Sequence, residues 1–333
     1  MPKMALSEFE LINQYFKSIV GHRKDVHLGI GDDAALLDVP EGQRLVVTVD
    51  TLVKDIHFSS DVTPEDLAHK SLVVNLSDLA AMGAAPAWVT LSLTIPEADK
   101  NWIESFSQKF AELCRYFDVQ LVGGDTCRGE LSVSVQAMGF VPHTSALKRS
   151  SAQPGDLIYV TGHIGDAGAG LALQQEQKTE YSIDEQFLIS RLDNPTPRLE
   201  VGIMLRNIAN AAIDISDGFI QDLSHILDAS DVGAVVEVGN LPVSDVMQSN
   251  YTEKQAQSFA MTAGDDYELC FTVSPENQDA LDRVLSTVSC PVTQVGRITA
   301  SKGLQLRNKD ELLQQPSLGY EHFSAGSIRD VSC

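Results

Sequence analysis

Residues 63–83 read TPEDLAHKSLVVNLSDLAAMG, and this stretch indicates how the first half of the chain folds. Thr63 suits a helix N-cap, Pro64 suits the first helical position, and the two acids that follow favour the positive end of the helix dipole. The pattern predicts a helix that ends near Gly83. A polar stripe follows one face of it, at helical spacing: Ser71, Asn75 and Asp78. This stripe is either a solvated face or a set of functional groups.

Strands and further helices are expected on both sides of this helix. A strand is predicted at 45–49 that ends on Asp50, and three more have strand-like alternation: 88–95, 119–122 and 131–141. Capping-box spacing at Ser7 predicts a first helix that continues to Ile19. An apolar stripe predicts a core-facing helix that contains Trp102, Phe106, Phe110 and Leu113.

The chain has 333 residues, which corresponds to about two domains. Residues 142–155 contain Pro, Ser, Lys and Arg without periodicity, so we expect a linker between domains 1–141 and 156–333. The second domain is predicted to alternate helices with strands near 157–161, 211–215, 234–238, 269–273 and 292–298. The fold class expected is α/β, with mixed sheets in two domains.

Charge and cysteine usage narrow the function classes. The 46 acidic residues outnumber the 24 basic residues and give a net charge of −22, which disfavours nucleic acid and anionic membranes as partners. Five cysteines form no C-x-x-C pair and the N-terminus lacks a signal-peptide pattern, so a cytoplasmic protein with reduced thiols is expected. The uncharged stretch 79–96 contains Gly83 and Pro86, and predicts a helix end, a turn and a strand instead of a membrane span.

Aspartates beside glycine or at the ends of apolar runs are the candidate functional groups. They occur in five segments: 31–33, 47–50, 123–125, 214–218 and 264–266. Clustered carboxylates need counter-charge, and Mg²⁺ supplies it with oxygen ligands that often include substrate phosphates. The same residues also suit caps and turns, and Asp217 could simply cap the helix that follows it.

Other motifs are less specific. The glycine-rich segment 162–170 lacks the Lys-Ser/Thr of a P-loop, so we interpret its small residues as tight helix packing. Lys148 and Arg149 form a rare basic pair that suits either a solvated loop or a phosphate. No nucleophilic triad is apparent, and His57 alone indicates a structural role.

Seven segments together resemble the bacterial thiamine-monophosphate kinases, in order along nearly the whole chain. They are LGIGDDAA (28–35), TVDTLV (48–53), HF (57–58), NLSDLAAMG (75–83), GGDT (123–126), DISDG (214–218) and DYEL (266–269). The resemblance implies a two-domain synthetase-like fold and a homodimer whose N-terminal sheets join into an intersubunit β-barrel. It further implies ATP binding near the domain junction, and several Mg²⁺ ions. The implied reaction moves the γ-phosphoryl of ATP onto thiamine monophosphate, giving thiamine diphosphate.

The resemblance also implies roles for single residues. The metal ligands would be Asp33, Thr48, Val49 through its backbone, Asp50, Asp78, Asp125, Asp214 and Asp217. ATP would contact Gly124, Asp125, Arg149 and Ser216, and the substrate would contact His57, Asp265 and Ser317. The residues expected to act directly in catalysis are Asp78, Asp125, Asp217 and Arg149.

Two positions depart from the family pattern. Asp265 stands where the family commonly has Glu, and Ser317 stands where it often has a Trp that stacks on the thiamine ring. Stacking would then come from Tyr320, Phe323 or elsewhere, or be weaker. Two alternatives stay open: another ATP-dependent member of the aminoimidazole ribonucleotide synthetase superfamily, or a non-catalytic homologue that binds nucleotide or metal.

Overall fold

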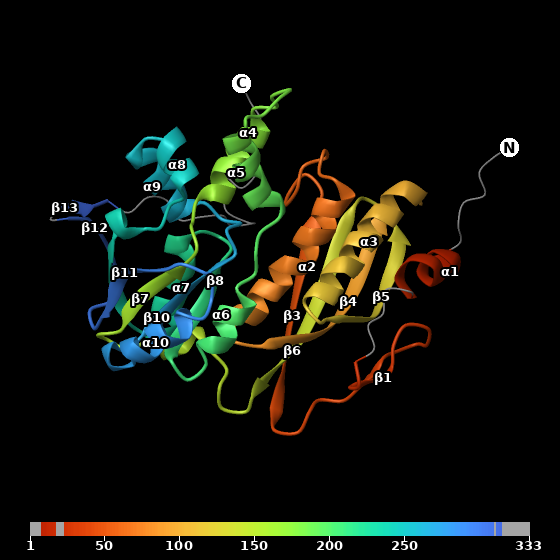
Figure 1. Cartoon of the computed structure of the whole chain (residues 1–333), viewed down its shortest axis with the longest axis horizontal. Coiled ribbons are helices and arrows are strands. Elements are labelled where there is room, and N and C mark those ends of the chain that lie inside the picture. Colours follow the sequence, from red (N-terminus) through yellow and green to blue (C-terminus); the bar gives the residue numbers. More distant parts are fainter. Residues whose placement is uncertain (1–7, 18–22, 310, 315–333) are drawn as a thin grey trace. The chain divides into compact units, whose positions relative to one another are not determined.

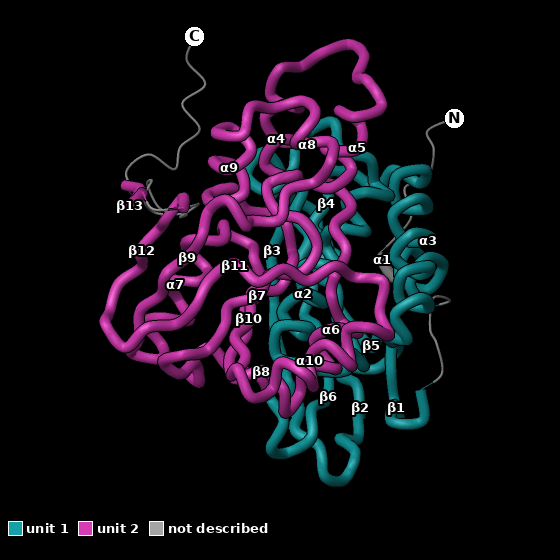
Figure 2. The backbone as a smooth tube through the Cα atoms, turned by 60° about the vertical axis from the view of Figure 1, so that its left-hand side comes forward, with its two compact units in different colours: residues 1–146 teal, residues 147–333 magenta. Residues whose placement is uncertain are grey.

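The chain divides into two compact units, residues 1–146 and residues 147–333. Figure 1 shows the computed structural model by sequence position, and Figure 2 colours the two units. The structure describes residues 8–17, 23–309 and 311–314. The boundary between the units lies inside the segment 142–155.

Unit 1 is built on a four-stranded mixed sheet in the order β3-β6-β4-β5. Its strands are β3 (Gln43–Val53), β4 (Ala85–Ile95), β5 (Gln120–Arg128) and β6 (Ser132–Pro142). β4 and β5 are parallel, and the other neighbours are antiparallel. A separate short pair is formed by β1 (Val26–Leu28) and β2 (Leu36–Leu37). Mixed α/β architecture, as predicted, is confirmed for this unit.

Two long helices accompany this sheet (Figure 1). In α2 (Pro64–Ala81) the N-cap side chain of Thr63 accepts a hydrogen bond from the Asp66 N–H at 3.1 Å, which confirms the predicted start. α3 (Lys100–Tyr116) buries its apolar stripe, in which Phe106 and Phe110 are fully buried. The first helix is described as α1 (Glu8–Leu11), followed by a π-helix at Ile12–Phe16. Ser7 and residues 18–22 lie outside the described residues.

The predicted end of the first long strand is wrong. β3 does not stop at Asp50 but continues to Val53, because it pairs with β6 along its whole length, from Gln43 opposite Pro142 to Val53 opposite Ser132. β5 is likewise longer than predicted, so Asp125 lies inside a strand. Both aspartates therefore project from paired strands instead of following them.

Unit 2 contains a seven-stranded sheet in the order β13-β12-β9-β11-β7-β10-β8. The strands are β7 (Leu157–Thr161), β8 (Ala209–Ile215), β9 (Gly233–Glu237), β10 (Glu268–Val273), β11 (Val292–Thr299), β12 (Gly303–Asn308) and β13 (Glu311–Leu313). β12 and β9 are parallel, and the other pairs are antiparallel. The five predicted strands are confirmed, whereas β12 and β13 were not expected.

Helices and short 3-10 turns connect these strands. They are the 3-10 turn η3 (Arg149–Ser151), α4 (Asp166–Gln175), α5 (Ile183–Asp193), α6 (Leu199–Met204), α7 (Phe219–Ser230), η4 (Val238–Asn240), α8 (Asp245–Asn250), α9 (Glu253–Thr262), η5 (Pro275–Asn277) and α10 (Gln278–Leu285). α7 contributes Phe219, Leu223 and Ile226 to the core of this unit.

The glycine-rich segment at the start of α4 serves packing, as interpreted from the sequence. A Cβ atom at Gly168 would lie 2.2 Å from the Cβ of Ala263, and one at Gly170 would lie 2.3 Å from the Leu188 carbonyl oxygen. The uncharged stretch 79–96 forms the end of α2, a turn and β4, as predicted. Among the described residues, no helix is both long and apolar enough to cross a membrane.

Candidate functional site

In unit 1, the polar stripe of α2 faces β3. Thr48 of β3 donates its hydroxyl hydrogen bond to Asp78 of α2. The Asp50 N–H donates to the Asn75 side-chain oxygen at 2.9 Å, and the Asn75 amide in turn donates to the Ser71 carbonyl oxygen at 3.0 Å. Asn75 and Ser71 are 0% and 1% exposed, so the alternative of a solvated face is wrong. Thr48, Asp50 and Asp78 are thereby held on facing elements by buried polar groups.

β5 presents Gly124 and Asp125, which pair in register with Leu91 and Ser92 of β4. A Cβ atom at Gly124 would lie 1.9 Å from the Leu91 carbonyl oxygen, so this position admits only glycine. Asp125 beside it is exposed. The strand therefore offers a bare backbone and one accessible carboxylate next to each other.

Two predicted metal ligands, Asp33 and Val49, and the predicted substrate contact His57 are exposed or half-buried in unit 1. Asp33 is exposed, and its N–H donates to the Asp32 carboxylate at 2.8 Å. The side chain of Val49 is exposed, so only its backbone could serve a metal. The His57 Nδ1 accepts from the Val53 N–H at 3.0 Å. Neutral His57 must then carry its proton on Nε2, which makes that nitrogen a donor.

In unit 2, β8 connects to α7 through residues 216–218, and we call the last two residues of β8 and this connection the turn 214–218. Asp214 is 3% exposed, while Ser216 and Asp217 are half-buried. The N-cap residue of α7 is Gly218, and no side chain caps the helix there, so the alternative that Asp217 caps this helix is wrong. Instead one oxygen of Asp222 accepts the N–H groups of residues 216, 217 and 218, at 3.0, 3.0 and 3.1 Å. Asp222, in the first turn of α7, therefore satisfies the N–H groups that a capping side chain would otherwise accept.

Asp222 carries an unusual carboxyl group. Burial and the neighbouring negative charge of Asp217 raise its pKa, three N–H donors lower it, and the net result is a pKa of about 7. Asp222 thereby fixes the backbone of the turn, although its burial disfavours the charged form of its carboxyl group. Sequence reasoning missed this residue, although an acid in the first turn of a helix that follows Ser-Asp-Gly is a capping signal.

A second segment lies directly against the turn 214–218: residues 264–267 and Glu268, the first residue of β10, which we together call the loop 264–268. The Asp265 N–H donates to the Ser216 carbonyl oxygen at 2.8 Å, and the Tyr267 N–H donates to the Ile215 carbonyl oxygen at 2.8 Å. A Cβ atom at Gly264 would lie 2.3 Å from the Ser216 carbonyl oxygen. The structure therefore brings Asp265, a predicted substrate contact, together with Ser216, a predicted ATP contact.

The remaining predicted residues are not brought into these contacts. Arg149 is exposed on η3, and its carbonyl oxygen accepts from Ser230 at 2.8 Å. Ser230 ends α7, whereas the turn 214–218 precedes that helix. Ser317, Tyr320 and Phe323 lie outside the described residues. Within the described part of the chain, no group of three or more His, Cys, Asp or Glu side chains is arranged to hold a metal ion.

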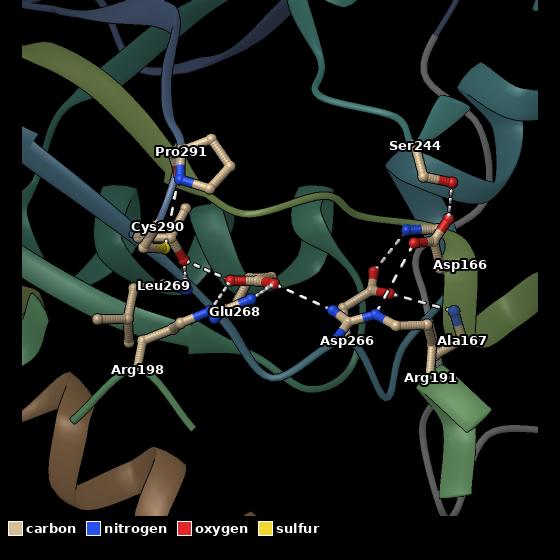
Figure 3. A network of polar contacts seen from close by, with 12 residues as sticks. Asp166, Ala167, Arg191, Arg198, Ser244, Asp266, Glu268, Leu269, Cys290 and Pro291 are labelled. Atoms are coloured by element: carbon tan, nitrogen blue, oxygen red, sulfur yellow. Dashed lines mark hydrogen bonds and ion pairs between the residues drawn. The ribbon is translucent and has the colours of Figure 1, made fainter. Parts of the chain in front are cut away.

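Sequence reasoning also missed a buried network of charged side chains behind the loop 264–268 (Figure 3). Glu268 is 0% exposed and accepts from Arg198 Nε at 2.5 Å and from Arg191 at 3.1 Å. Asp266 accepts the Gly165 N–H at 2.7 Å. Burial raises the pKa of Asp266 well above its usual range, although that N–H lowers it. These residues hold the loop from its inner side.

Two family models cover most of the chain: "AIR synthase related protein, N-terminal domain" matches residues 31–141, and "AIR synthase related protein, C-terminal domain" matches residues 153–309. The thiamine-monophosphate kinase of Escherichia coli strain K12 is 50% identical over 323 residues, which are 96% of this chain and 99% of that protein. The chain belongs to the thiamine-monophosphate kinase family. The Bacillus subtilis member is 34% identical, over 96% of this chain and 100% of its own length.

Solved structures of thiamine-monophosphate kinases share the whole fold. The enzyme from Stenotrophomonas maltophilia superposes with a TM-score of 0.84 at 44% identity, over 91% of this chain and 97% of the other. A structure described as "AaThiL complexed with AMPPCP and TMP" superposes with a TM-score of 0.76 at 29% identity, over 97% of this chain and 100% of the other. The predicted resemblance and the two-domain synthetase-like class are thus confirmed.

Proposed function

We propose that this chain transfers the γ-phosphoryl group of ATP to the phosphate of thiamine monophosphate, giving thiamine diphosphate and ADP. The observation that carries the proposal is the full-length likeness to the relative that was solved with AMPPCP and TMP, together with 50% identity to curated thiamine-monophosphate kinases. The fixed acidic turns and the bare backbone at Gly124 supply groups that such a reaction can use.

The chemistry of the acceptor explains why this chain needs no obvious general base. The second pKa of a phosphate monoester is about 6, so the acceptor oxygen is largely ionised near pH 7. What the protein must supply is alignment of donor and acceptor, and charge stabilisation during transfer. Rigid backbone turns, such as the one that Asp222 fixes at 216–218, serve alignment.

We propose that acidic groups of this chain hold Mg²⁺ ions. The donors fit this ion, because they are hard oxygen ligands and because Thr48 and Asp78 already meet on facing elements. The proposed ligands are Asp33, Thr48, Val49 through its backbone, Asp50, Asp78, Asp125, Asp214 and Asp217. When bound, Mg²⁺ neutralises the charge of phosphate oxygens and permits two polyanions to approach.

The other groups of the chain have roles that follow from their chemistry. Gly124 lets backbone approach a nucleotide closely, and Ser216 offers a hydroxyl on a fixed turn. The exposed guanidinium of Arg149 suits phosphate oxygens. His57 can donate from Nε2 to an oxygen of the substrate, whereas Asp265 can only accept hydrogen bonds or pair with a cation.

A product assay tests the proposed activity. Purified protein with ATP, Mg²⁺ and thiamine monophosphate should release ADP and thiamine diphosphate in equal amounts, whereas thiamine and a purine ribonucleotide should give no product. ATP-dependent ring closure of a ribonucleotide would instead select a synthetase of the wider superfamily. Tight nucleotide binding without ADP release would select a non-catalytic homologue, and either result would end the proposal.

We also propose that two copies of the chain associate through the sheet of unit 1. The supporting feature is the outer face of β3, an edge strand, where Leu45, Val47 and Val49 are 41%, 49% and 59% exposed. Exposed apolar edge strands are rare in monomers because they pair with other chains. A second copy that extends this sheet would produce the intersubunit β-barrel expected from the family.

Replacing Val47 by Asp should separate such a dimer. A charge buried at an apolar interface should weaken association by about a hundredfold or more. Sedimentation velocity over a range of concentrations measures this change. Gln108→Glu adds the same charge on the exposed side of α3 and should leave the dimer intact. A wild-type protein that stays monomeric at micromolar concentration, or a Val47→Asp variant that stays dimeric, would contradict the proposal.

We place the reaction in the cytoplasm, where thiols stay reduced. Among the described residues, Cys114, Cys127, Cys270 and Cys290 are free thiols, which agrees with this placement. We further propose that domain 1–141 serves dimerisation and ATP and Mg²⁺ binding, that 142–155 is a linker, and that 156–333 is the C-terminal α/β domain.

A further inference from the structure

The loop 264–268 is held in a conformation that its residues would not adopt alone. Asp265 and Tyr267 have φ angles of +67° and +52°, in the left-handed region that favours glycine. Such conformations persist only where the surrounding structure determines them, and they concentrate at functional sites. The contacts that hold this loop therefore indicate what it presents.

Alternate residues of the loop are anchored on its inner side. Asp266 accepts the Gly165 N–H at 2.7 Å and the Ala167 N–H at 3.3 Å at the start of α4. Glu268 pairs with Arg191 of α5 and with Arg198, the N-cap residue of α6 (Figure 3). Both carboxylates are buried. The carboxylates of Asp266 and Glu268 thus fix the backbone on either side of Tyr267. Among the described side-chain hydrogen bonds, neither carboxylate contacts the turn 214–218.

The intervening residues contact each other and the turn. The Tyr267 hydroxyl donates to Asp265 Oδ1 at 3.1 Å, and the Asp265 N–H is tied to Ser216. Tyr267 is 8% exposed, whereas Asp265 is half-buried, so the phenol lies within the fold and the carboxylate reaches solvent. A buried hydroxyl that bonds an accessible carboxylate selects one rotamer of that carboxylate.

We propose that Tyr267 is a positioning residue that holds the Asp265 carboxylate in the orientation that binds thiamine monophosphate. The inference rests on the proposed function, in which Asp265 contacts thiamine monophosphate, and adds Tyr267 as the residue that orients this carboxylate. A carboxylate that holds no cation repels the polyphosphate of ATP, whereas thiamine monophosphate carries a thiazolium cation and an amino group that such a carboxylate attracts. These groups do not react, and we infer that the loop binds them equally in the ground state and the transition state, which affects KM and leaves kcat unchanged.

Tyr267→Phe removes only the hydroxyl and provides the test. The KM for thiamine monophosphate should rise about tenfold, which is the value of one hydrogen bond to a charged group. The kcat and the KM for ATP should stay within about twofold, because they depend on other contacts. The matched control is Tyr159→Phe, since Tyr159 is 6% exposed in the same unit, and all three constants should stay unchanged.

A second variant shows whether Tyr267 acts through Asp265. Asp265→Gly suits the positive φ of this position and removes the carboxylate, so the KM for thiamine monophosphate should rise at least tenfold. Adding Tyr267→Phe to Asp265→Gly should then change that KM by less than about twofold, because coupled residues are not additive.

Several outcomes would overturn the inference. An unchanged KM for thiamine monophosphate in either single variant would do so, as would an equal effect of Tyr267→Phe in the presence and absence of the Asp265 side chain. A raised Mg²⁺ requirement with an unchanged KM would instead assign Asp265 to a metal. Failure of the wild-type protein to form thiamine diphosphate would end the proposed function itself, so the two failures are distinguishable.

Discussion

Asp78→Asn is expected to lower kcat by about a thousandfold while the protein stays folded, because the variant keeps the shape of the side chain and removes its charge. Asp78 lies on α2, accepts from Thr48 of β3, and is one of the proposed Mg²⁺ ligands. The neutral amide binds a hard cation poorly, so the concentration of Mg²⁺ that gives half-maximal rate should rise as well. Steady-state kinetics over a Mg²⁺ series measure both effects.

Glu65→Gln is the matched control for Asp78→Asn, because it removes one negative charge from an exposed position in the first turn of the same helix. Its kcat should stay within about twofold of the wild type, as expected for a surface substitution. Asp125→Asn on β5 should reproduce the loss seen with Asp78→Asn. A normal kcat in both Asp78→Asn and Asp125→Asn would remove the proposed metal site from unit 1.

Local sequence signals predicted the helices better than the limits of the strands. α2 begins at Pro64 because Thr63 caps it, and both signals are adjacent in the sequence. The length of β3 depends instead on β6, whose residues 132–142 follow about ninety positions later, so the predicted end at Asp50 was wrong. β12 and β13 were missed because they are short and largely exposed, and alternation in so few residues is weak.

The burial of polar groups was the least predictable part of the candidate site. The stripe of Ser71, Asn75 and Asp78 could have been a solvated face, and only the approach of β3 shows that it is not. Glu268 resembles a surface acid in the sequence, because its partners Arg191 and Arg198 lie 77 and 70 residues away. Motif resemblance predicted positions such as Asp214 and Asp217, and these stay predictions, but it gave no signal for Asp222, which fixes the backbone of the turn.

Glu268→Gln is expected to lower the free energy of unfolding by about 3–5 kcal/mol, because it leaves buried arginine charge without its counter-charge. Glu268 is 0% exposed, and its Oε2 also accepts from the Thr161 hydroxyl at 2.7 Å. Burial lowers the pKa of Arg198, but the hydrogen bond and the charge of Glu268 together outweigh it and leave the pKa raised, so this guanidinium stays charged. Denaturant unfolding followed by circular dichroism measures the loss.

Two comparisons separate the buried ion pair from ordinary loss of a surface charge. Glu253→Gln changes an exposed acid at the start of α9 and should alter stability by less than about 0.5 kcal/mol. The double variant Arg198→Met, Glu268→Gln should lose less free energy of unfolding than the two single variants lose together, by about 1 kcal/mol or more. The reason is that each single variant leaves a buried charge without its partner, whereas the double variant removes both members of this pair. Additive losses, or a Glu268→Gln variant as stable as the wild type, would show that the network does not hold the loop 264–268 in place.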